Sequence, residues 1–116
     1  MVERSREAAS ILQKEGVNCT LVDMHTIKPL DEDLLARLSR QCGSFVTAED
    51  HSVIGGLGSS IAEWISTNNP IPLEMVGVKD RFGESGGTSE LMEKMSLTSE
   101  DICKSVRKSI NRKNVP

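Results

Sequence analysis

At 116 residues the chain has the size of one domain, which can bury a hydrophobic core without disulfide bonds or metals. Hydrophobic residues make up 37% and charged residues 27%, a globular composition that excludes a disordered chain. The net charge of −3 excludes a basic surface over the whole protein. One tryptophan, two phenylalanines and no tyrosine are too few to form a base-stacking surface, so we predict no nucleic-acid partner.

The first predicted element is a helix over residues 2–15, where apolar residues recur on one face and Gly16 marks the end. A strand is predicted next over residues 19–24. A second helix is expected over residues 32–42, with Asp31 as its N-cap, acidic residues in its first turn and a glycine after its last turn.

A second strand is predicted over residues 44–48, and residues 49–51 after it are interpreted as an acidic turn that carries a histidine. Apolar residues at helical spacing then predict a helix over about residues 57–66. A third strand is expected over residues 73–78, followed by a polar, glycine-rich loop over residues 79–87.

Two helices are predicted to end the chain, a short one that Thr88 caps and a longer one that begins at a capping box of Thr98 and Asp101. Helices that alternate with strands indicate an α/β fold, in which a mostly parallel sheet carries helices on both faces. In such folds ligands bind at the carboxyl ends of the strands, so we expect any functional surface at that edge.

The glycine loop that contains Gly55, Gly56 and Gly58 has two interpretations. Backbone amides at the start of a helix bind anions, which favours a phosphate site. Alternatively, the glycines allow positive φ angles and close packing of strand and helix. A dinucleotide fingerprint would require glycine at Ile61, and the loop lacks the Lys-Ser/Thr pair of a P-loop.

Titratable side chains supply further candidates near the same edge. His51, beside Glu49 and Asp50, is either an acid–base group or a contact residue, although no nucleophile is identifiable near it. His25 and His51 are weak evidence for a metal site. The charged loop around Arg81 has three interpretations: it pairs with the surface of a partner, it holds a substrate phosphate, or it forms internal ion pairs.

The three cysteines are widely spaced and contain no C-x-x-C motif, a pattern that fits a reducing compartment better than a disulfide framework or a zinc site. Cys42 and Cys103 fall at or near apolar helix positions and are predicted to be buried structural thiols. No apolar run approaches the length of a membrane span. We therefore predict a cytoplasmic protein without a membrane partner.

Four segments together resemble a known family: D-M-H-T-I-K-P-L-D (23–31), V-T-A-E-D-H-S-V-I-G-G-L-G-S (46–59), G-V-K-D-R-F-G-E-S-G (77–86) and L-T-S-E-D-I (97–102). They resemble the C-terminal domain of transketolases, and specifically the C-terminal subunit of the split, two-chain form. The same domain type occurs in 1-deoxyxylulose-5-phosphate synthase and in the β subunits of 2-oxo acid dehydrogenases.

The resemblance implies a single three-layer α/β/α domain over residues 1–116, with a mixed, mostly parallel five-stranded sheet. Domains of this family normally begin with a strand and a Gly-Ser/Thr turn, and here Met1 stands where that turn should be. We therefore expect a domain that is truncated at its N-terminus, lacks its first strand and has an exposed sheet edge. Reduced stability or compensating dimer contacts are expected to follow.

The resemblance also implies a function. The whole enzyme would be a cytoplasmic transferase of the pentose phosphate pathway, which moves two-carbon ketol units between sugar phosphates with thiamine diphosphate and Mg²⁺. The upstream domains would hold both cofactors, so this chain is expected to contribute no catalytic, cofactor-binding or metal-binding residue and to be inactive alone. Its partners would be the N-terminal transketolase domains or subunit, within a homodimer.

Candidate contacts with the other domains or the rim of the active site are Glu49, Asp50, His51, Gly55, Gly56, Gly58 and Arg81. Two alternatives remain. The chain is the equivalent domain of a 1-deoxyxylulose-5-phosphate synthase or a 2-oxo acid dehydrogenase β subunit, or it is a stand-alone anion-binding or interaction module.

Overall fold

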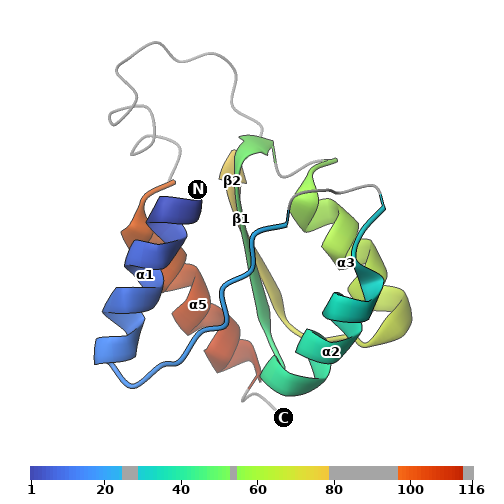
Figure 1. The fold of residues 1–116 in the computed structure, drawn as a ribbon, viewed down its shortest axis with the longest axis horizontal. Coiled ribbons are helices and arrows are strands. Elements are labelled where there is room, and N and C mark those ends of the chain that lie inside the picture. Colours follow the sequence, from blue (N-terminus) through green and yellow to red (C-terminus); the bar gives the residue numbers. More distant parts are fainter. Residues whose placement is uncertain (25–28, 53–54, 79–96, 114–116) are drawn as a thin grey trace.

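The computed structural model describes residues 1–24, 29–52, 55–78 and 97–113. Helices and strands alternate along most of this length, as predicted (Figure 1). The elements are α1 (Val2–Lys14), α2 (Glu32–Cys42), β1 (Phe45–Ser52), α3 (Leu57–Asn68), β2 (Leu73–Val78) and α5 (Ser99–Lys113). The short helix predicted after Thr88 lies outside the described residues.

The described sheet consists of two parallel strands, β1 and β2. Their pairing runs from Phe45 opposite Leu73 to Ser52 opposite Val78, with an irregularity after Ala48. The last pairing step takes four residues of β1 but two of β2, so β1 bulges there. Parallel pairing requires a crossover connection, which α3 provides.

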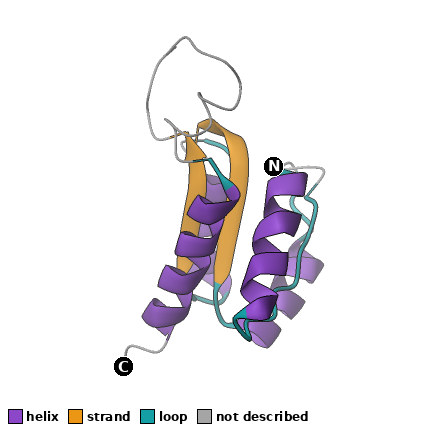
Figure 2. Ribbon diagram, turned by 90° about the vertical axis from the view of Figure 1, so that its left-hand side faces the viewer, coloured by secondary structure: helices purple, strands orange, loops and turns teal. Residues whose placement is uncertain are grey.

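Helices cover both faces of the sheet, so the three-layer α/β architecture is confirmed (Figure 1). Helices α1 and α5 pack together on one face, and α2 and α3 lie on the other. Figure 2 shows α5 lying across the strands, whereas α1 stands beside them. Two separate groups of buried side chains result: Ala8, Leu12, Val76, Leu97, Ile102 and Cys103 in one, and Leu35, Ile61, Trp64 and Ile65 in the other.

The strand predicted over residues 19–24 is wrong. This segment forms no strand, and the described sheet offers it no neighbour. A strand exists only through hydrogen bonds to an adjacent strand, and a local preference for extended backbone cannot supply that adjacent strand. Leu21 consequently leaves 46% of its surface exposed.

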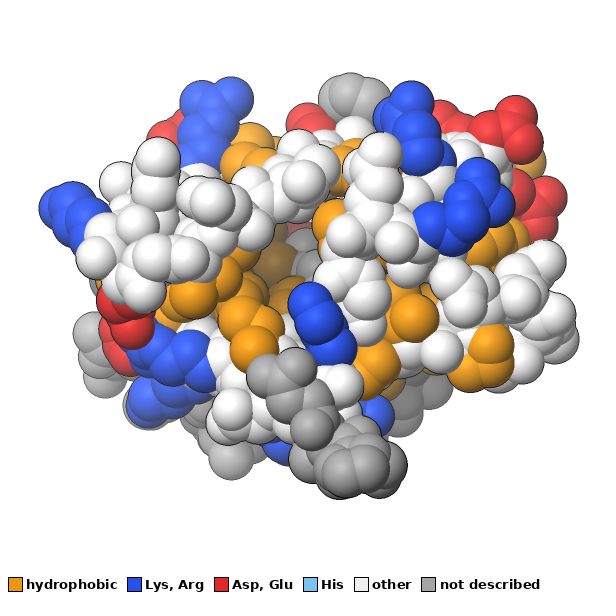
Figure 3. Space-filling model, turned by 90° about the horizontal axis from the view of Figure 1, so that it is seen from below, with side chains coloured by type: hydrophobic (Ala, Val, Ile, Leu, Met, Phe, Trp, Pro, Cys, Tyr) orange, Lys and Arg blue, Asp and Glu red, His pale blue; other side chains and the backbone are white. Residues whose placement is uncertain are grey.

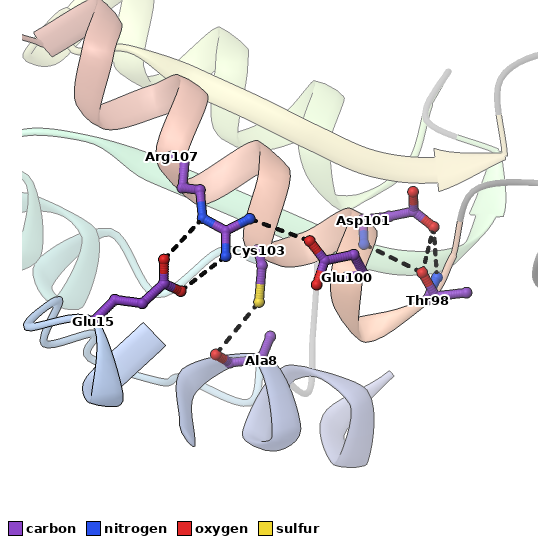
Figure 4. A network of polar contacts seen from close by, with 7 residues as sticks. All are labelled: Ala8, Glu15, Thr98, Glu100, Asp101, Cys103 and Arg107. Carbon is purple, nitrogen blue, oxygen red and sulfur yellow. Dashed lines mark hydrogen bonds and ion pairs between the residues drawn. The ribbon is translucent and has the colours of Figure 1, made fainter. Parts of the chain in front are cut away.

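Both ends of α2 and the start of α5 follow their local signals. An Asp31 carboxylate oxygen accepts a hydrogen bond from the Leu34 backbone N–H at 3.1 Å, and Gly43 ends α2 with a φ of 74°. The predicted capping box is also present (Figure 4). The Asp101 N–H donates to the Thr98 hydroxyl at 3.2 Å, and the Thr98 N–H donates to the Asp101 carboxylate at 3.0 Å.

The contact between α1 and α5 combines a buried thiol with exposed ion pairs (Figure 4). Cys103 is fully buried, as predicted, and its Sγ lies 3.6 Å from the Ala8 carbonyl oxygen. Above it, the Arg107 guanidinium reaches Glu15 at 2.8 Å and Glu100 at 3.2 Å. The ion pairs are exposed and screened by salt, so the buried thiol and its apolar neighbours carry most of the contact.

We expect Cys103 to resist alkylation in the folded chain, because burial excludes the reagent and raises the pKa of its thiol above the usual 9.0. Mass spectrometry after a pulse of iodoacetamide should find Cys19, which is exposed, modified first. Equal modification of both thiols under native conditions would contradict this.

The raised pKa of Cys103 also predicts how stability depends on pH. Above pH 9 the thiol of the unfolded chain ionises, while the thiol of the folded chain keeps its proton. The free energy of unfolding should therefore fall with rising pH.

Candidate functional site

The corner at the carboxyl end of β1 contains most of the predicted contact residues. Residues 49–51 belong to β1, so their predicted turn is wrong: the pairing continues across the bulge to Ser52. Gly55 and Gly56 form the turn that follows, and Gly58 lies in the first turn of α3. Arg81 lies outside the described residues, as does the side chain of His51, so their contact roles stay predictions.

Glu49 connects β1 to the start of α3. The residue is 7% exposed, and its carboxylate accepts one hydrogen bond from the backbone N–H of Leu57 and another from that of Gly58, each at 2.9 Å. The N-cap residue of α3, Gly56, has no side chain that could accept these bonds. Glu49 therefore caps α3 from another element and places a negative charge at the positive end of the helix dipole.

This cap bears on the interpretation of the glycine loop as an anion site. The amides of Leu57 and Gly58 already hold a carboxylate of the same chain. The Gly55 N–H donates to the Ser59 hydroxyl at 3.1 Å. An external phosphate would have to displace these internal acceptors, so the geometry favours a packing role for the loop.

The glycines themselves serve backbone conformation and close approach. Gly55 has a φ of +77°, in the left-handed region that glycine adopts most easily. A Cβ on Gly58 would lie 2.5 Å from the Met75 sulfur and 2.9 Å from the Thr47 hydroxyl oxygen. No side chain larger than hydrogen fits at Gly58 without movement, so the first turn of α3 packs directly on both strands.

Within the described residues, no group of three or more His, Cys, Asp or Glu side chains lies close enough together to hold a metal ion. His25, one of the two histidines considered as ligands, lies outside the described residues. The helices in the described part of the chain are all too short or too polar to cross a membrane.

A second feature is a cleft of about 700 Å³ along the edge of β1 that does not pair with β2, here named the open-edge cleft. Residues 17–24 form one wall and residues 44–48 the opposite wall. Seen from below, Figure 3 shows a hollow lined by hydrophobic side chains. Helices contribute its apolar surfaces through Leu34, Leu35, Leu38, Leu57 and Ile61 on one side and Val2, Ile102, Val106 and Ile110 on the other.

Sequence reasoning missed the capping role of Glu49, although a signal was present. A helix whose N-cap is glycine needs an acceptor from elsewhere, and Glu49 is the acidic residue on the strand that precedes it.

Comparisons with known proteins agree with this geometry. A family model described as "Transketolase, C-terminal domain" matches residues 1–102. A 6-deoxy-6-sulfo-D-fructose transketolase subunit of Clostridium sp. (strain MSTE9) is 44% identical over 98% of this chain and 35% of its own length. A 1-deoxy-D-xylulose-5-phosphate synthase of Gloeobacter violaceus is 34% identical over 99% of this chain and 18% of its own length.

Among solved structures, a split-gene transketolase described as an inactive β4 tetramer superposes with a TM-score of 0.93 at 46% sequence identity. The superposition covers 97% of this chain and 37% of that one. This chain thus spans about a third of a related transketolase subunit, and the larger part of such a protein has no counterpart here.

Proposed function

Because this chain belongs to the family of transketolase C-terminal domains, we propose that it is the non-catalytic C-terminal part of a transketolase that depends on thiamine diphosphate. The complete enzyme transfers two-carbon ketol units between sugar phosphates. The family match over residues 1–102 carries the proposal. Identities of 44% and 46% to transketolase subunits, against 34% to a 1-deoxyxylulose-5-phosphate synthase, favour transketolase chemistry over that alternative.

The internal roles of the corner residues support a structural function for this part of the enzyme. Glu49 caps α3 and Gly58 allows α3 to pack on the strands, so both serve the chain itself. The proposed contacts with the upstream domains and the active-site rim therefore rest on the remaining candidates: Asp50, His51, Gly55, Gly56 and Arg81. The polypeptide that carries the upstream domains is the proposed partner, within a homodimer in the cytoplasm.

Cofactor binding separates this proposal from a self-sufficient enzyme. Titration calorimetry of the isolated chain with thiamine diphosphate and Mg²⁺ should give no binding heat, because the upstream domains are proposed to hold both. Ketol transfer should appear only when those domains are supplied. Saturable micromolar binding of thiamine diphosphate by the isolated chain would overturn the proposal.

A further inference from the structure

Strand β2 has a second edge, here named the outer edge, opposite the one that pairs with β1. The Phe45 N–H donates to the Pro72 carbonyl at 2.9 Å, and Phe45 lies opposite Leu73. In a parallel pair, the backbone groups of successive residues point alternately toward the neighbouring strand and away from it. The N–H and C=O groups of Leu73, Met75 and Gly77 therefore point to the outer edge, with which no strand pairs in the described part of the chain.

The outer edge belongs to a strand whose composition favours pairing with a copy of itself. The sequence of β2 is L-E-M-V-G-V, in which Glu74 is the single charged residue. Short segments with few charges at an open edge recruit an identical strand. Antiparallel pairing with β2 of a second copy would place Leu73 of one copy opposite Gly77 of the other, and Met75 opposite its counterpart.

Arg112, from the last turn of α5, occupies the beginning of the outer edge. Its Nη1 donates to the Leu73 carbonyl oxygen at 2.8 Å and also to the Glu74 carboxylate. The Leu73 carbonyl is one of the outward-pointing acceptors that a pairing strand needs. The guanidinium group takes this acceptor and places a charge over the edge, and charges at an edge strand oppose the addition of another strand.

Glu74 holds the Arg112 side chain in this position. Residues 108 and 112 lie one helical turn apart on α5, so both side chains reach the same carboxylate. The Lys108 ammonium lies 3.4 Å from it, and Arg112 forms the second ion pair. Only 14% of the Glu74 side chain is exposed, so these ion pairs are less screened by water than those of Arg107. The guanidinium is thereby fixed beside Leu73.

We propose that Arg112 prevents this chain from associating with a second copy through the outer edge of β2. Removing the Arg112 side chain frees the Leu73 carbonyl for a pairing strand. Removing the Glu74 side chain releases the guanidinium from its anchor and adds an uncharged residue to the strand. Both changes should therefore promote association. The proposal concerns contacts within this chain and does not depend on the proposed function.

Sedimentation velocity at several concentrations tests the proposal. Arg112→Ala should lower the dissociation constant of self-association about tenfold relative to the unaltered chain, the equivalent of one net hydrogen bond. Loss of one positive charge changes the net charge from −3 to −4, which by itself opposes association. Glu74→Ala changes the net charge in the opposite direction and should also promote association. Lys104→Ala makes the same charge change as Arg112→Ala at an exposed position of α5 and should behave as the unaltered chain.

Hydrogen exchange of single amides locates the contact. When Arg112→Ala is concentrated enough to be mostly dimeric, the outward-pointing amides of Met75 and Gly77 should exchange more slowly than in dilute solution. The amides of Glu74 and Val76 point to β1 and should not change.

Two results would overturn the proposal: Arg112→Ala associates no more than Lys104→Ala, or its association leaves exchange at Met75 and Gly77 unchanged. Circular dichroism first establishes that each variant is folded. If Arg112→Ala does not fold, the same two criteria apply to Glu74→Ala.

Discussion

Replacing Glu49 by alanine is expected to lower the free energy of unfolding by about 2–5 kcal/mol, because two backbone donors lose their acceptor in a buried place. Loss of a negative charge at the helix N-terminus adds to this cost. Trp64, the single tryptophan, lies buried in α3 and reports on the same helix. Urea unfolding followed by its fluorescence should show a lower midpoint with an unchanged slope.

Two variants separate the cap from general effects of substitution. Glu63→Ala removes an exposed glutamate from the same helix and should change stability by less than about 0.5 kcal/mol. Glu49→Gln keeps one acceptor oxygen and should fall between Glu49→Ala and the unaltered chain. If Glu49→Ala unfolded at the same urea concentration as Glu63→Ala, the carboxylate would not be the cap that holds α3.

Gly58→Ala should cost about 1–3 kcal/mol, because the new methyl group would overlap Met75 and Thr47. Alanine is favoured over glycine in a helix by about 1 kcal/mol. A loss of stability therefore means that the steric overlap outweighs helix propensity, and a gain means the opposite. Thermal unfolding followed by circular dichroism measures it. A variant that is more stable than the unaltered chain would show that the strands yield to the methyl group.

A double-mutant cycle identifies the overlapping partner. The closest contact of the new methyl group is the flexible Met75 side chain, so Gly58→Ala combined with Met75→Ala should cost less than the sum of the single changes. Ser60→Ala, two residues after Gly58 in α3, provides the matched control and should leave the free energy of unfolding almost unchanged. Additive costs would mean that the strain lies elsewhere, with the Thr47 hydroxyl as the other candidate.

Elements with local signals could be predicted from the sequence. Helix α2 begins and ends where Asp31 and Gly43 indicate, since both act within one turn of the helix. The capping box at Thr98 is equally local. Residues 19–24 show the limit, because a segment that fits an extended backbone becomes part of a sheet only beside a neighbouring strand.

The corner after β1 required information that local patterns do not contain. Glu49 was interpreted as a neighbour of His51 or as a contact residue, yet its carboxylate caps a helix that begins eight residues later in the chain. The bulge that carries the strand through residues 49–51 depends on pairing with Val78. Both features depend on interactions between separate elements of the chain, whereas the positive φ of Gly55 follows from its residue type.

The packing of α1 on α5 sets the order in which the chain can fold during synthesis. The buried group of Leu35, Ile61, Trp64 and Ile65 comes from one contiguous stretch and can close early. The buried group that contains Ala8 and Leu12 is completed only after Ile102 and Cys103 have been synthesised. Ribosomes add about 5–20 residues per second, so the apolar face of α1 stays uncovered for roughly 5–20 s in the nascent chain, long enough for a chaperone to bind it.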